Sequence, residues 1–212
     1  MTDLRISLAK LGLAALVTFL GAPAHAGTVL YDSTGDPPIF AQSIYSVGPI
    51  YESFSTGANT GALSLLELSL AVGFSDSTYG ITVGLYSDSS TSPGSLITTL
   101  ATIPDSSLST VPTLTNVSLS SNPLLTSGTR YWIGLSAGGP GQWNYSITPG
   151  GTRVAGEYFD TFAGVYPTAD ALYLMEVGIN NSPPSTSTPE PGTCLLTAGG
   201  IGLLFAWRRR AA

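Results

Sequence analysis

The chain has 212 residues and a net charge of −6, and only 9% of its residues are charged. Its single histidine, His25, and its single cysteine, Cys194, lie in the two terminal segments, so residues 27–180 contain neither. This stretch therefore has no disulfide framework, no Ser-His-Asp or Cys-His catalytic centre, and no zinc or copper site built on imidazole or thiolate.

The stretch between the terminal segments is also strongly acidic. Eleven Asp and Glu residues stand against two bases, Arg130 and Arg153, which gives a net charge of −9. Such a surface repels phosphate backbones, so we expect no nucleic-acid partner. It suits an extracellular setting, where neutral sugars and divalent cations are available partners.

Residues 1–26 have the layout of a secretory signal peptide. Arg5 and Lys10 precede an apolar run, Leu11–Ala22, and Pro23 leads into Ala24-His25-Ala26. A core helix would carry polar residues on one face, and this run has almost none. We therefore expect signal peptidase to cut after the A-x-A site, so that the mature chain starts at the next residue.

Residues 27–179 alternate between apolar and polar side chains with a period of two. Strict alternation predicts strands that present one face to a core and the other to a more polar environment. Turn signals rich in Gly and Pro separate the runs, and no long helical period occurs. We predict one all-β domain, an antiparallel two-sheet sandwich of jelly-roll type. The apolar positions of the runs are Leu66/Leu68/Leu70/Val72, Ile81/Val83/Leu85, Tyr131/Ile133/Leu135, Trp143/Tyr145/Ile147 and Tyr173/Met175/Val177/Ile179.

The C-terminal part of the chain has a linker followed by three distinct pieces. Residues 180–188 are rich in Ser, Thr and Pro and predict a solvated linker. Within residues 189–212, Pro189-Glu190-Pro191 precedes the apolar run Gly192–Trp207, and Arg208-Arg209-Arg210 follows it. A helix over the apolar run would cover about 24 Å, short of a hydrocarbon core of about 30 Å. This short hydrophobic helix is either a permanent anchor or a transient stop.

This three-part layout resembles the PEP-CTERM sorting signal of Gram-negative bacteria, which export proteins into a polysaccharide matrix. The resemblance implies export across the inner membrane and processing by an exosortase near Pro189-Glu190-Pro191. It also implies that membrane attachment through Gly192–Trp207 and Arg208–Arg210 is transient. The final location would be the cell surface or the extracellular matrix.

The central domain carries a second set of motifs: Gln42-Ser43, Glu52–Gly57, Ile81–Asp88, Ser92-Pro93-Gly94 and Leu125–Leu135. These strand and turn patterns resemble the choice-of-anchor R domain. That family pairs one β-rich domain with differing C-terminal surface anchors and has no assigned activity. The resemblance therefore implies a fold and a surface location, and no catalytic residues.

Three functions remain open for the domain. The first is a non-enzymatic structural or adhesive role in exopolysaccharide or biofilm. The second is a carbohydrate-binding module that stacks sugars on Trp132, Trp143 and Tyr145, with Tyr158 and Tyr166 as further aromatic candidates, although most such rings pack in cores. Because Tyr131 shares its face with two core positions, we expect the neighbouring Trp132 to point outward.

The third function is a glycoside hydrolase that uses two carboxylates, which needs no histidine. No pair among the eleven acids stands out in the sequence. We expect no cofactor, and calcium is the one ion that the available oxygen ligands would suit. Asp32–Asp36 and the region of Asp76 are the loops considered for it, yet Asp-Ser-Thr-Gly clusters are also ordinary turn chemistry.

Overall fold

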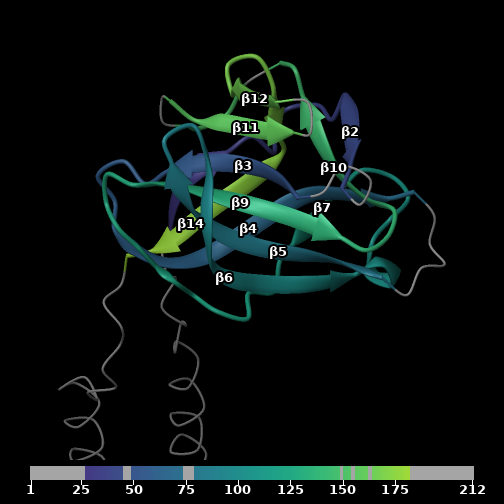
Figure 1. Cartoon of the computed structure of the whole chain (residues 1–212), viewed down its shortest axis with the longest axis horizontal. Helices are drawn as coiled ribbons and strands as arrows, with labels where there is room; N and C mark the ends of the chain where they lie inside the picture. The colour runs from purple at the N-terminus through teal and green to yellow at the C-terminus, as the bar shows by residue number, and fades with distance from the viewer. Residues whose placement is uncertain are drawn as a thin grey trace, which may run out of the picture. The chain divides into compact units, whose positions relative to one another are not determined.

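The computed structural model describes residues 27–44, 49–73, 79–148, 150–153, 156–161 and 164–181 (Figure 1). Within these ranges the chain forms strands and one short 3-10 turn, η1 (Asp105–Ser107), and no α-helix. The predicted signal peptide and its cleavage site at Ala24 and Ala26 lie outside the described residues. So do most of the linker and the whole sorting segment with Pro189–Pro191 and Arg208–Arg210.

The strands form two antiparallel sheets, as the alternation predicts. The eight-stranded sheet contains β1 (Thr28–Asp32), β14 (Met175–Asn180), β4 (Gly61–Val72), β10 (Gly141–Ser146), β13 (Leu172–Tyr173), β2 (Phe40–Ser43), β7 (Thr113–Asn116) and β8 (Leu124–Leu125). The six-stranded sheet contains β12 (Gly164–Pro167), β11 (Tyr158–Thr161), β3 (Ile50–Ser55), β9 (Arg130–Ala137), β5 (Gly80–Ser89) and β6 (Ser92–Pro104).

Four nested strand pairs identify the topology. The innermost pair is the β5–β6 hairpin, and around it lie β4 with β7, β3 with β9, and β1 with β14, all antiparallel. The strand order is consequently β1-β14-β4-β7 in one sheet and β3-β9-β5-β6 in the other. This is one long hairpin rolled into two sheets, which is a jelly roll. The predicted fold is confirmed.

The core lies between the sheets and is made by the predicted inward faces. On β4, Leu66, Leu68, Leu70 and Val72 are all at most 1% exposed. The three inward residues predicted on β5 are fully buried, as are Ile133 and Leu135 on β9. Each buried side chain of this size contributes roughly 1.5–3 kcal/mol relative to an exposed one, so these faces hold the sheets together.

The last predicted strand is two strands in the structure. β13 pairs with β10, whereas β14 pairs with β1 and β4. Leu174 separates them because its backbone is used elsewhere: its N–H donates to the Asn144 carbonyl, and its carbonyl accepts from Ser69 N and Trp143 Nε1. The prediction of one continuous strand over residues 173–179 is therefore wrong at Leu174.

The two ends of the described chain lie at the same end of the domain, because Thr28 pairs with Ile179 (Figure 1). β14 runs to that end from Met175, which Leu174 alone separates from β13 and its contacts with β10. The strands β2, β10, β11 and β12 gather at the other end, at the top of Figure 1.

Candidate functional site

Trp132 is not an exposed ring. It does lie on the opposite face of β9 from Tyr131, which belongs to the core, but none of its surface is accessible. Its Nε1 donates to Asp88 Oδ1 at 2.8 Å, and Arg130 forms an ion pair with the same carboxylate at 2.9 Å. The Arg130 guanidinium in turn lies 5.0 Å from the ring centroid of Tyr158. Trp132 therefore points outward as expected, but its predicted role as a glycan contact is wrong, because a second layer of side chains covers the outer face of the sheet.

Trp143 is a core residue. It is fully buried and stacks on Tyr173 with ring centroids 4.6 Å apart, and its Nε1 donates to the Leu174 carbonyl. A sugar could reach neither indole in this structure. The glycan platform predicted on Trp132 and Trp143 is corrected accordingly.

Tyr145, the third predicted glycan contact, lies at the surface with one part exposed. It belongs to four rings that we call the aromatic row: Phe40, Tyr145, Phe159 and Tyr166. Successive ring centroids lie 5.4, 6.3 and 5.1 Å apart. Phe40 is 48% exposed and Tyr166 is 38% exposed, whereas Phe159 is buried. The row thus presents aromatic surface at both ends and partly at Tyr145.

The aromatic row crosses from one sheet to the other. Phe40 and Tyr145 come from β2 and β10 of the eight-stranded sheet, and they are direct partners in its register. Phe159 and Tyr166 come from β11 and β12 of the six-stranded sheet and are likewise direct partners. The row therefore covers the end of the sandwich that lies away from Thr28 and Ile179.

Tyr173 supports the row from beneath. Its ring makes edge contacts with Tyr145 and Phe159, with centroids 5.9 and 5.4 Å apart. Its backbone N–H donates to Glu52 Oε2 at 2.9 Å, and Tyr31 donates its hydroxyl to Glu52 Oε1 at 3.0 Å. The buried side chain of Glu52, on β3, therefore links β3 to both β13 and β1 beneath the row.

Glu52 is fully buried, and this burial raises its pKa well above the usual value for a glutamate. The hydrogen bonds from Tyr173 and Tyr31 oppose that increase, the charge of Glu157 adds to it, and the charge of Arg153 opposes it. Burial likewise raises the pKa of Tyr31, and the Glu52 carboxylate adds to that rise. We expect a buried Glu52 to hold its proton over a wider pH range than an exposed glutamate does.

Glu52 and Glu157 are the two acids that the structure brings together inside the domain. Glu157 is 2% exposed, and its Oε1 accepts a hydrogen bond from Ser55 N at 3.1 Å. Glu157 also lines a pocket of about 450 Å³ together with Arg153, Tyr158 and Thr168. Only Glu157 of the pair borders this pocket, so the arrangement lacks the two open carboxylates between which a glycosidic bond would fit.

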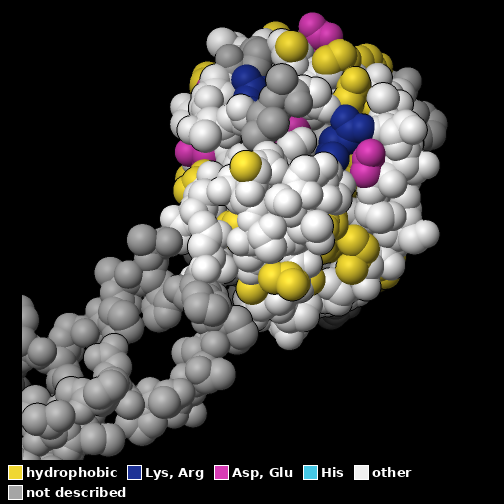
Figure 2. Space-filling model, turned by 90° about the vertical axis from the view of Figure 1, so that its left-hand side faces the viewer, with side chains coloured by type: hydrophobic (Ala, Val, Ile, Leu, Met, Phe, Trp, Pro, Cys, Tyr) yellow, Lys and Arg dark blue, Asp and Glu magenta, His cyan; other side chains and the backbone are white. Residues whose placement is uncertain are grey.

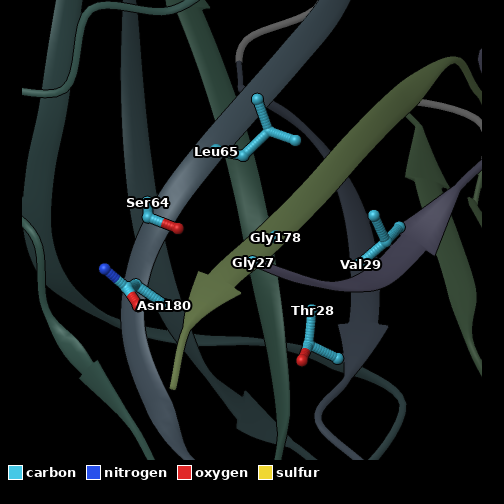
Figure 3. A pocket seen from close by; sticks show the side chains of 7 residues that line it. All are labelled: Gly27, Thr28, Val29, Ser64, Leu65, Gly178 and Asn180. Carbon is cyan, nitrogen blue, oxygen red and sulfur yellow. The ribbon is translucent and has the colours of Figure 1, made fainter. Parts of the chain in front are cut away.

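A second pocket, of about 360 Å³, lies between β1, β4 and β14 (Figure 3). Gly178 forms its floor and pairs with Val29 on one side and Leu65 on the other. A Cβ at this position would lie 3.1 Å from Leu65 Cβ, so glycine keeps the hollow open. None of the described residues that line this pocket is charged, and the pocket adjoins the predicted mature N-terminus, Gly27.

The Asp32 and Asp36 carboxylates, considered above as calcium ligands, accept hydrogen bonds from the protein itself. Asp32 Oδ1 accepts from the backbone N–H and the hydroxyl of Thr34, and Asp36 Oδ2 accepts from Gly150 N. These are turn-forming hydrogen bonds. Among the described residues, no three His, Cys, Asp or Glu side chains are grouped as metal ligands. Asp76 lies outside the described residues.

Charged groups are sparse on the domain surface, and Figure 2 shows a face on which few of them interrupt polar and hydrophobic side chains. Of the two arginines in the domain, Arg130 is paired with Asp88, and Arg153 donates to the Thr168 carbonyl. Neither belongs to the aromatic row. The row was only partly predictable, because Phe40 lies in a four-residue strand without a clear alternation.

The fold and the surface together define an acidic jelly-roll domain with an exposed aromatic end. The family described as the PEP-CTERM protein-sorting motif matches residues 187–210, which include the predicted Pro-Glu-Pro tripeptide and arginine cluster. This motif implies an exported protein that is processed by an exosortase. Comparison with curated proteins finds no match. Within the described ranges, no helix combines the length and the apolar character needed to cross a membrane.

Proposed function

We propose that the protein is a non-catalytic surface or matrix protein of a Gram-negative bacterium, with a structural or adhesive role in exopolysaccharide or biofilm. The observation that carries this proposal is the sorting motif at residues 187–210. Signal peptidase and exosortase act on the chain during export, and the surrounding polysaccharide is its partner afterwards. The short apolar segment holds the chain at the membrane only until processing.

Two features of the domain support this role. The sequence between the terminal segments contains neither histidine nor cysteine, which removes the commonest nucleophile and base pairs. The strand and turn motifs of the domain also resemble those of the choice-of-anchor R domain, and we propose that it belongs to that group. Such domains pair one β-rich body with a surface anchor.

Intact mass of the exported form tests the processing. We expect a chain that starts at Gly27 and has lost Arg208-Arg209-Arg210, because both terminal segments are addresses that are removed. A variant with Pro189-Glu190-Pro191 replaced by three alanines should keep its arginine cluster and stay in the membrane fraction. A full-length chain recovered from the cytosol would refute export.

Deletion of the gene tests the role in the matrix. We expect altered flocculation or matrix texture, restored by the wild-type chain and not by the triple-alanine variant. An unchanged matrix, with the protein free in the medium, would argue against a structural role.

Carbohydrate binding is a second candidate function, and the aromatic row favours it. Aromatic side chains combine a large apolar face with, in tyrosine, a polar hydroxyl, which suits a ligand that is apolar on its ring faces and polar at its edges. This property would give the domain direct contact with the polysaccharide.

A further inference from the structure

We propose that the aromatic row is a binding site for a neutral polysaccharide, which stacks on the exposed rings of Phe40 and Tyr166 and contacts the partly exposed Tyr145. The proposal rests on the proposed function, since it names the surface through which the domain contacts the matrix. The predicted contacts Trp132 and Trp143 play no part in it because both are buried.

The geometry of the row suits an extended chain of sugar rings. Its rings follow one another at centroid separations of 5.4, 6.3 and 5.1 Å, and they run from β2 to β12 across the end of the domain. Phe40 and Tyr166, at the two ends, are the most exposed. A ligand that spans the row would contact both sheets, whereas a single sugar would contact only one end.

The rings are held in place before any ligand binds. Phe159 is 5% exposed, and it packs between Tyr145, Tyr166 and the ring of Tyr173. Tyr173 is fixed in turn by stacking on Trp143 and by its N–H bond to Glu52. A preorganised platform loses little conformational entropy on binding, which favours affinity.

The charges around the row favour a neutral ligand. The acidic Asp160 follows Phe159 directly, and the domain carries a net charge of −9 with only two arginines. One arginine is paired with Asp88 and the other donates to Thr168. An anionic polysaccharide would meet repulsion at this surface and no basic side chain to offset it.

The row and the last described strand residue lie at opposite ends of the domain. The chain leaves the domain after β14, at the end where Thr28 pairs with Ile179. The row lies at the other end of that strand, beyond Met175 and Tyr173. The end of the domain at which the described chain stops is therefore free of the row.

Affinity electrophoresis of the processed protein tests the site. Native gels would contain dextran or soluble hydroxyethyl cellulose as neutral probes, or alginate as the anionic one. We expect at least one neutral gel to retard the wild type and alginate to leave it unretarded. Phe40→Ala and Tyr166→Ala should each weaken retardation about tenfold, the effect expected for losing one stacking ring.

Tyr79→Ala is the matched control, because Tyr79 is 57% exposed and lies outside the row. It should bind as the wild type does, and thermal melts would confirm that all three variants are folded. Unretarded wild type in both neutral gels, or full retardation of both row variants, would overturn the proposal. A wild-type dimer that Phe40→Ala converts to a monomer would also overturn it, since the row would then bind a second copy.

The outcome separates this site from the proposed function. A deletion strain with an altered matrix, together with no glycan retardation, would reject the site and keep the structural role. Retardation that depends on Phe40 and Tyr166, together with an unchanged matrix, would keep the site and reject that role.

Discussion

Glu52 shows how one buried acid makes the stability of the domain depend on pH. Its raised pKa means that the folded state holds this proton more tightly than the unfolded state. The resulting stabilisation is fully present below the unfolded pKa of about 4.3 and is lost as pH rises through the folded pKa. Burial raises the pKa values of Asp160 and Glu176 as well, which acts in the same direction.

We therefore expect the free energy of unfolding to fall as pH rises from about 4.3 toward 8. Glu52→Gln, which is neutral at every pH, should flatten this dependence and be more stable than the wild type at pH 8. Urea unfolding, followed through the buried Trp132 and Trp143, measures both effects. Asp170→Asn, at an exposed carboxylate, is the control and should keep the wild-type profile. If the stability of Glu52→Gln fell with pH as steeply as that of the wild type, Glu52 would not be the cause of the pH dependence.

Gly134 is required by the rings packed on the outer face of the six-stranded sheet. A Cβ at this position would lie 2.5 Å from Cε1 of Tyr51 and 2.6 Å from Cε2 of Tyr86, and these two rings meet edge to face at 5.1 Å. Gly134→Ala should destabilise the domain by about 1–3 kcal/mol, because the rings must move.

Gly35→Ala is the matched control for this substitution, since nothing lies within 4 Å of the Cβ it would add. It should be neutral or stabilise the domain by up to about 1 kcal/mol, through a smaller unfolded-state entropy. Chemical denaturation of the two variants measures the difference. Equal stabilities of Gly134→Ala and Gly35→Ala would show that the Tyr51 and Tyr86 rings can move aside without a cost in free energy.

At the scale of the elements, β4 carries most of the eight-stranded sheet. It pairs with β14 and β10 along one edge and with β7 and β8 along the other. Leu68→Ala on this strand should lower the free energy of unfolding by about 2–5 kcal/mol, because the truncated side chain would leave a cavity in the core between the sheets. Ser64→Ala, at an exposed position of the same strand, should change stability by less than about 0.5 kcal/mol. Comparable losses of stability in Leu68→Ala and Ser64→Ala would show that the inward face of β4 is not part of the core.

The sequence predicted the strands whose two faces differ and missed those whose faces do not. β4, β5 and β9 alternate because one face meets the core. β6 runs over thirteen residues at the sheet edge, and three register irregularities with β5 break its alternation. β2 has only four residues, all at least partly exposed, so no pattern marks it. Phe40, one of the four rings of the aromatic row, was not predicted for that reason.

The site residues were harder to predict than the strands, because alternation gives the face of a residue and not what covers it. Trp132 is on the predicted face, yet Asp88, 44 positions away in sequence, lies against its indole nitrogen. Glu52 and Tyr173 are 121 positions apart and meet only in the rolled fold. Contacts of this range follow from the topology, which one sequence does not reveal.

At the scale of the whole molecule, nested pairing brings together residues that are far apart along the chain. β1 and β14 are the outermost pair, so both described ends of the chain lie together. The same pairing leaves the strands β2, β10, β11 and β12 at the far end of the domain (Figure 1). These strands supply the four rings of the aromatic row. Fold, attachment and exposed surface are thus consequences of one arrangement of strands.

The place of β14 has a mechanical consequence for a protein held at a surface. This strand lies between β1 and β4, with hydrogen bonds along both edges, and the chain departs from its last residue. A pull on that end, resisted by polymer caught at the opposite end, would act along the strand axis. The load would be shared in shear by both ladders at once, instead of peeling bonds apart one after another.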